Sequence, residues 1–169
     1  TIWSSDCVYV RQAVTLTPGK SYTLSGYVRS GGPRGVMRVA YTVGNETFTL
    51  DSEPGKVWEK TDNMPYERVS VSFTLPENAE PKVYCMAYCD TQNGFKGGNC
   101  WFDAMQLEEG LTLNHFNMIQ NSDFSAVGTD GKPKAWTVGN NSNSYVSVLP
   151  LDDKDDIFHA PDCLKHDNT

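Results

Sequence analysis

The feature that most constrains the fold is the alternation of apolar and polar side chains in short segments separated by turn residues. A period of two is typical of half-buried β-strands, whereas an amphipathic helix requires a period of about 3.6 residues. No segment of ordinary helix length has the helical period. The sequence therefore predicts an all-β protein, with strands at residues 7–14, 21–30, 35–43, 46–50, 66–75, 83–90, 100–107 and 145–149.

The spacing of these segments, about 8 to 12 residues, is typical of a β-sandwich or jelly roll. The stretch 100–110 is the most informative, because alternation places Trp101, Asp103 and Met105 on one face and the residues between them on the other. An acidic pair and Gly110 then end this strand.

Charge and length narrow the class of protein. A chain of 169 residues is long enough for a single domain with its own core. The net charge of −7 argues against a nucleic-acid partner and against an anionic membrane surface. The sequence has no apolar run long enough to span a membrane and no signal peptide, so we expect an excised piece whose targeting segment lies elsewhere.

The five cysteines are an odd number, so at least one has no partner within the chain. Cys85 and Cys89 share a strand face but lie too far apart along it for an easy disulfide. A zinc site that combines them with Cys100 lacks a fourth ligand. We therefore expect most of the cysteines to be small buried apolar residues.

Sequence signatures of enzymes are missing. The chain has no Gly-x-Ser-x-Gly, no His-Glu-x-x-His and no phosphate-binding glycine-rich loop. Its three histidines lie in polar segments. Carboxylate pairs such as Glu108–Glu109 and Asp155–Asp156 are adjacent, and neighbours in a strand point to opposite faces, which does not suit a glycosidase. The prediction is that the chain is not an enzyme.

Three motifs resemble a known family. They are PGKSYTLSGYVR at residues 18–29, WFDAMQLEEG at 101–110 and NMIQNSDFS at 117–125. They resemble carbohydrate-binding modules of families four and nine, which often occur in large surface proteins of Gram-positive bacteria, including those with Rhs/YD repeats. The resemblance implies a galactose-binding-like jelly-roll β-sandwich in an extracellular or cell-surface protein with flanking modules.

The motifs stand in permuted order, because residues 1–117 resemble the later strands of a module and residues 118–169 its opening strands. One explanation is a chain cut across tandem modules. The other, which we favour, is a single sandwich of residues 1–169 that the C-terminal part completes, within its own chain or in a strand-swapped dimer. Residues 118–121 should then pair as a strand within the same sandwich as 100–107, and Leu164 should be buried beside the strand at 7–14.

The resemblance implies a non-catalytic module that binds glycan on a concave sheet face or at edge loops. Aromatic rings pack against sugar faces, and planar polar groups bind sugar hydroxyls. On strand 83–90 we expect Tyr84 and Tyr88 outside, because Cys85 and Ala87 are smaller and pack more easily inside. We expect Trp101 and Trp136 in the core. The candidate ligand residues are Tyr27, Arg29, Arg38, Trp58, Tyr84 and Tyr88.

The family also implies a structural calcium ion held by oxygen ligands. Asp103 and Asp123 match acidic positions of the closing and opening motifs, whereas Ser125 stands where the family often has an acidic residue. The predicted partners are a glycan and flanking modules, with no nucleic acid and no membrane insertion. The alternatives are a spacer or protein-interaction sandwich without a glycan ligand, and a fragment of a glycoside hydrolase.

Overall fold

The computed structural model describes residues 8–57, 65–90, 98–111, 116–139, 144–150 and 162–168. Every regular element in these residues is a β-strand, as the alternation predicts. None of the described residues forms a helix that could cross a membrane. The strands are β1 (Val8–Thr15), β2 (Ser21–Gly31), β3 (Arg34–Val43), β4 (Glu46–Asp51), β5 (Glu67–Thr74), β6 (Lys82–Asp90), β7 (Gly98–Glu109), β8 (Thr137–Gly139), β9 (Ser144–Pro150) and β10 (Asp162–Asn168).

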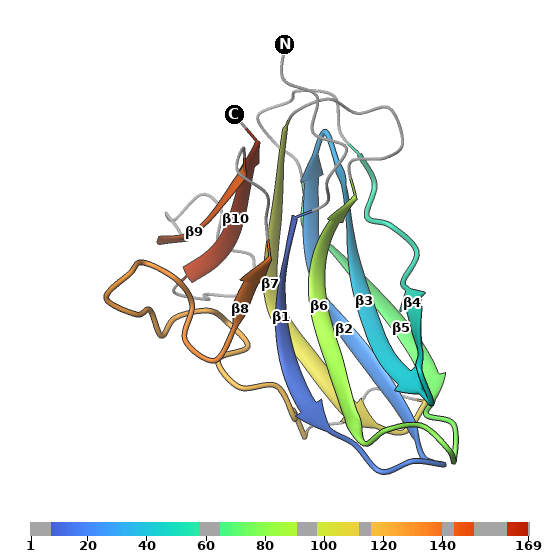
Figure 1. The fold of residues 1–169 in the computed structure, drawn as a ribbon. Helices are drawn as coiled ribbons and strands as arrows, with labels where there is room; N and C mark the ends of the chain where they lie inside the picture. The colour runs from blue at the N-terminus through green and yellow to red at the C-terminus, as the bar shows by residue number, and fades with distance from the viewer. Residues whose placement is uncertain are drawn as a thin grey trace.

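The strands form two sheets that pack face to face (Figure 1). Sheet A has the order β4-β3-β6-β1-β8, and sheet B has the order β5-β2-β7-β10-β9. All strand pairings within these sheets are antiparallel. The predicted all-β sandwich is therefore confirmed.

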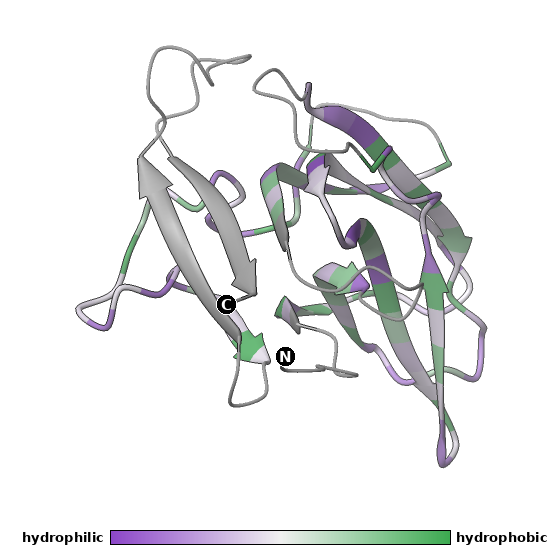
Figure 2. Cartoon of the chain, turned by 90° about the horizontal axis from the view of Figure 1, so that it is seen from above, coloured by the Kyte–Doolittle hydropathy of each residue, from purple (hydrophilic) through white to green (hydrophobic). Residues whose placement is uncertain are grey.

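The core lies between the sheets, and on strands such as β5 it takes alternate residues, with Val69, Val71 and Phe73 facing inward. Short green and purple bands along the strands in Figure 2 show this alternation. On β6, Cys85 and Ala87 are buried, whereas Tyr84 and Tyr88 are half-buried on the outer side, as predicted. On β2, Leu24 is fully buried between the sheets. Burial of such apolar side chains is the main favourable term in folding.

A β-bulge in β7 interrupts the expected alternation. The pairing of β2 with β7 shifts between Ser25 and Tyr27, and Ala104 has a φ of 46°. One additional residue on β7 therefore lets both Phe102 and Met105 point into the core, where both are buried. The prediction that Met105 shares a face with Trp101 and Asp103 is wrong for this reason.

Residues after 116 contribute to both sheets. β8 pairs with β1, and β10 pairs with β7 and β9. Residues 118–121 lie beside β7, where the backbone N–H of Met118 donates to the carbonyl of Leu107 at 2.8 Å, but they do not form the strand that we expected. Leu164 is opposite Phe102 of β7, so its strand does not pair with β1 as we expected. The assignment of 1–117 and 118–169 as permuted parts of a module stays a prediction.

Gln12 connects β1 to the segment that precedes β8. Its amide nitrogen donates to the carbonyls of Gln120 at 3.0 Å and Ala135 at 3.2 Å, and its amide oxygen accepts from the N–H of Gln120 at 2.9 Å. Because Gln12 is buried, these bonds satisfy polar groups that would otherwise be costly to bury. The segment is therefore fixed to sheet A by polar contacts.

β4 is an edge strand of sheet A and pairs with β3. All six of its residues are exposed, including Phe48 and Leu50. Phe48 stacks on Tyr41 of β3, with ring centroids 5.7 Å apart. The strand begins with Glu46 and ends with Asp51.

Candidate functional site: the tyrosine–arginine face of sheet A

The outer face of sheet A gathers aromatic and cationic side chains from three neighbouring strands. Alternation turns Tyr9 and Arg11 of β1 outward because Val10 and Gln12 between them point into the molecule. The same rule exposes Arg38 of β3 and the two tyrosines of β6. These residues, which we call the tyrosine–arginine face, are Tyr9, Arg11, Arg38, Tyr84 and Tyr88.

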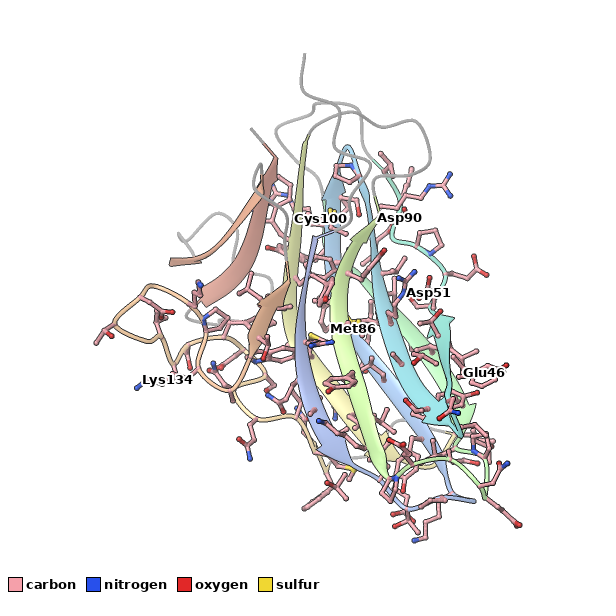
Figure 3. All side chains as sticks on the ribbon, viewed as in Figure 1. Glu46, Asp51, Met86, Asp90, Cys100 and Lys134 are labelled. Carbon is pink, nitrogen blue, oxygen red and sulfur yellow. The ribbon has the colours of Figure 1, made fainter. Side chains whose placement is uncertain are left out.

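The tyrosine–arginine face lines an open hollow of about 400 Å³. The central residue of its floor is Met86, which is opposite Arg11 on one side and Arg38 on the other in strand register. Figure 3 labels Met86 on β6 and Asp51 at the end of β4. The threonines Thr47 and Thr49 of β4 also line the hollow.

Rings and guanidinium groups stack on one another across the strands. Tyr9 and Tyr88 are direct cross-strand neighbours, and their ring centroids are 6.1 Å apart at an interplanar angle of 14°. The guanidinium carbon of Arg38 lies 3.5 Å from the centroid of Tyr88, and that of Arg11 lies 4.5 Å from the centroid of Tyr84. Such cation–π contacts hold both the ring and the cation in place.

Charge on the face is partly balanced by one acidic residue. Arg38 donates to both carboxylate oxygens of Asp51, at 2.6 and 2.7 Å, and this pairing raises the pKa of Arg38 above its ordinary value. The nearby ammonium of Lys82, and then Arg11, lower the pKa of Tyr84 although its partial desolvation acts in the opposite direction. The face thus offers flat ring surfaces beside planar cationic donors, which suits a ligand with stacked rings and anionic oxygens.

The structure divides the predicted ligand residues between two faces. Arg38, Tyr84 and Tyr88 lie together on sheet A, whereas Tyr27 and Arg29 belong to β2 and lie on the outer side of sheet B. Strand order, which alternation does not reveal, separates the two sets. Trp58 lies outside the described residues.

The outer side of sheet B has its own stacked groups. The guanidinium of Arg29 lies 4.9 Å from the ring centroid of Trp101, and that of Arg68 lies 5.7 Å from the ring of Tyr27. Trp101 therefore lies on the outer face of its sheet and is half-buried, which contradicts its expected place in the core. Trp136 is buried, as expected.

Two residues of the face on sheet A were missed by the sequence reasoning. Tyr9 and Arg11 were seen as part of an alternating strand, but neither was assigned to a face. The apolar residues Val10 and Val14 could have identified them. Val10 and Val14 are on the inward-facing side of the strand, and Tyr9 and Arg11, at alternate positions, therefore face outward.

The two predicted calcium ligands are engaged with nearby groups. A carboxylate oxygen of Asp103 accepts from the N–H of Ala104 at 2.6 Å. A carboxylate oxygen of Asp123 accepts from the N–H of Ser125 at 3.2 Å and from its hydroxyl at 3.0 Å. Across the part of the chain with described side chains, no three His, Cys, Asp or Glu residues gather as a metal site. The calcium ion stays a prediction.

Comparison with known proteins gives sequence relatives but no family, because no family model matches the chain. A tRNA nuclease WapA of Bacillus subtilis (strain 168) is 28% identical over 122 residues, which cover 69% of this chain and 5% of that protein. A tRNA(Glu)-specific nuclease WapA of Bacillus subtilis subsp. natto is 29% identical over the same shares. A tRNA3(Ser)-specific nuclease WapA of Bacillus spizizenii is 28% identical. The chain thus spans about 5% of the length of these relatives.

Among solved structures, the chain is similar to the CBM22-1–GH10 modules of a Clostridium thermocellum xylanase bound to xylohexaose. The TM-score is 0.42 and the sequence identity is 16%, with 62% of this chain and 20% of that chain covered.

The names of the relatives contradict three predictions made from the sequence. These are a non-catalytic glycan-binding module, the absence of enzymatic activity, and the absence of a nucleic-acid partner; the curated relatives are instead named as nucleases of tRNA. The net charge and the missing signatures describe only these 169 residues, whereas the match covers 5% of each relative. The extracellular location stays a prediction.

Proposed function

We propose that this chain is a β-sandwich module of a larger polypeptide with tRNA nuclease activity, and that its tyrosine–arginine face contacts single-stranded RNA. The observation that carries the proposal is the gathering of three tyrosine rings and two guanidinium groups around one open hollow on sheet A. The names of the curated relatives support RNA as the substrate of the whole polypeptide.

The chemistry of the face matches unpaired nucleotides. A base presents a flat π surface that stacks on tyrosine, and each such contact contributes roughly 1 to 3 kcal/mol as measured by alanine substitution. Guanidinium groups bind phosphate oxygens through N–H donors. Arg11 can offer a paired set, whereas Arg38 uses Nε and Nη2 for Asp51 and can offer only its remaining N–H groups. Tyr84 with Arg11 and Tyr88 with Arg38 form two such ring–cation pairs side by side. Two consecutive nucleotides of a tRNA loop or 3′ end are the ligand that this arrangement suits.

The overall charge limits how the RNA is held. With a net charge of −7, long-range attraction does not draw RNA to the protein, so the affinity must come from local contacts. If two arginines each contact one phosphate, the logarithm of the binding constant should fall with the logarithm of salt concentration with a slope of about −1.4. This weak salt dependence distinguishes a stacking face from a basic groove.

The test measures fluorescence anisotropy of a labelled single-stranded oligoribonucleotide, and separately of labelled tRNA, with the full chain. Tyr88→Leu removes the ring but keeps apolar bulk, whereas Tyr88→Phe keeps the ring. We expect Tyr88→Leu to weaken binding roughly 5- to 150-fold and Tyr88→Phe to bind like the original protein. Tyr84→Leu is the second variant, should Tyr88→Leu fail to fold.

Two results would overturn the proposal. One is the absence of RNA binding by the full chain at concentrations where it remains folded. The other is binding that Tyr88→Leu and Tyr84→Leu leave unchanged but that Tyr27→Leu, on the opposite sheet, abolishes. The second result would move the RNA contact to sheet B.

A further inference from the structure

Two buried cysteines meet between the sheets at one end of the sandwich. Cys89 is on the inner side of β6 in sheet A, and Cys100 is on the inner side of β7 in sheet B. Their Sγ atoms are 3.2 Å apart, and the exposed fractions of the two residues are 1% and 0%. Figure 3 shows Cys100 level with Asp90, the last residue of β6.

The two sheets converge at this end, which is why such short side chains can meet. The backbone N–H of Gly35 in sheet A donates to the hydroxyl of Ser30 in sheet B at 3.0 Å. A Cβ atom on Gly35 would lie 2.3 Å from a methyl carbon of Val28, so the glycine allows this close approach. The Cys100 thiol also lies 3.3 Å from the carbonyl oxygen of Pro33, in the turn between β2 and β3.

We infer that Cys89 and Cys100 form a disulfide that joins sheet A to sheet B. A disulfide requires the sulfurs at about 2.05 Å, so they must approach by only about 1 Å from where they stand. The oxidant is a low-molecular-weight disulfide such as oxidised glutathione. Its S–S bond breaks, the bond between Cys89 and Cys100 forms, and two electrons and the two thiol protons pass to the oxidant, which leaves as two thiols. Because both residues are buried, the exchange takes place while this end of the sandwich is open during folding.

Cys85 provides a matched control on the same strand. It lies four residues from Cys89 along β6, a distance of roughly 13 Å, which is too far for a disulfide. It is fully buried, and burial raises the pKa of its thiol to about 12. Cys85 therefore stays a thiol under conditions that oxidise the pair.

The disulfide closes a short loop, because its two residues are 11 positions apart in the sequence. In the chain-entropy model, a cross-link that closes a loop of this length lowers the entropy of the unfolded chain. For a domain of this size, the melting temperature of the oxidised protein should therefore be about 6 to 12 °C higher than that of the reduced protein.

The experiment refolds the full chain in a mixture of reduced and oxidised glutathione, then unfolds it in denaturant with iodoacetamide, so that every remaining thiol, buried ones included, is blocked. Unreduced chymotryptic peptides are then identified by mass spectrometry, because cleavage after Tyr88 separates Cys85 from Cys89. We expect a linked peptide pair containing Cys89 and Cys100, and alkylated Cys85. The melting temperature is compared with and without a phosphine reductant for the original protein, Cys85→Ser, Cys89→Ser and Cys100→Ser.

The redox-dependent shift in melting temperature should be present in Cys85→Ser and absent in Cys89→Ser and Cys100→Ser. Because the readout is the difference between oxidised and reduced states of each variant, a general loss of stability does not mimic it. The peptide map of the original protein gives an answer even if a variant fails to fold. Alkylation of Cys89 and Cys100 after oxidative refolding, or a link from either one to Cys7 or Cys163, would overturn the inference.

Discussion

Replacing Phe124 by alanine tests whether the segment after β7 is an integral part of the sandwich core. The side chain of Phe124 is completely buried, and its ring centroid is 5.1 Å from that of Trp136. Trp136 is itself held by a hydrogen bond from its indole N–H to the carbonyl of Asn121 at 3.0 Å. The substitution therefore leaves a cavity beside Trp136, one of the four tryptophans that contribute to the fluorescence.

The expected loss follows from the burial of this ring. Replacing a fully buried phenylalanine by alanine typically costs about 3 to 5 kcal/mol, because transfer and cavity terms add. No strain is released in compensation, since Phe124 has a φ of 58° and alanine has no easier access to that conformation. For a chain of this size the melting temperature should fall by roughly 6 to 20 °C.

Phe116→Ala is the matched control, because Phe116 is the same residue type in the same segment but is 75% exposed. Its free energy of unfolding should change by no more than about 0.5 kcal/mol. Urea unfolding is followed by Trp fluorescence and by circular dichroism. Equal effects of the two substitutions would refute the reasoning. So would a fluorescence transition that separates from the circular dichroism transition in the original protein, because the segment would then unfold independently.

Two further predictions concern a metal ion and a thiol. If Asp103 and Asp123 hold calcium, calcium at 100 times its dissociation constant should raise the free energy of unfolding by about 2.7 kcal/mol, and Asp123→Asn should remove this effect. Thermal unfolding with calcium and with EDTA measures it. An unchanged melting temperature contradicts the site. The pKa of Cys85 is raised from its ordinary 9.0 to about 12, so between these values the unfolded chain loses a proton that the folded chain keeps. The stability that this thiol contributes should therefore be fully present below pH 9, and above it the free energy of unfolding should fall by up to about 1.4 kcal/mol per pH unit. Urea unfolding midpoints measured from pH 8 to 11 should fall less steeply for Cys85→Ala than for the original protein. Parallel midpoint curves for the two proteins would count against the buried thiol.

Much of the fold could be predicted because side-chain alternation is a local property. The orientation of β6 followed from size alone, since Cys85 and Ala87 fit between the sheets more easily than Tyr84 and Tyr88 do. The bulge at Ala104 could not be predicted in this way. An added residue changes the phase of a strand without changing its composition, so alternation assigned Met105 to the wrong face.

The candidate site was harder to predict because it depends on which strands are neighbours. Arg38 and Tyr88 come together only because β3 pairs with β6, and Tyr9 joins them only because β1 pairs with β6 on the other side. Tyr27 and Arg29 have the same chemical character but lie in the other sheet. Function was harder still, since the net charge of 169 residues says little about the substrates named for relatives of which the match covers 5%.

The exposed edge strand β4 affects whether copies of this sandwich aggregate when many of them are crowded together. Its unpaired side presents backbone groups that could template a strand from another molecule. The strand has only six residues; Glu46 stands at its start, and the Asp51 carboxylate at its end is paired with Arg38. Two such edges brought together could share a ladder of at most six residues on each strand, so crowded copies gain few backbone hydrogen bonds at this edge, and the short strand limits growth into a shared, aggregating sheet.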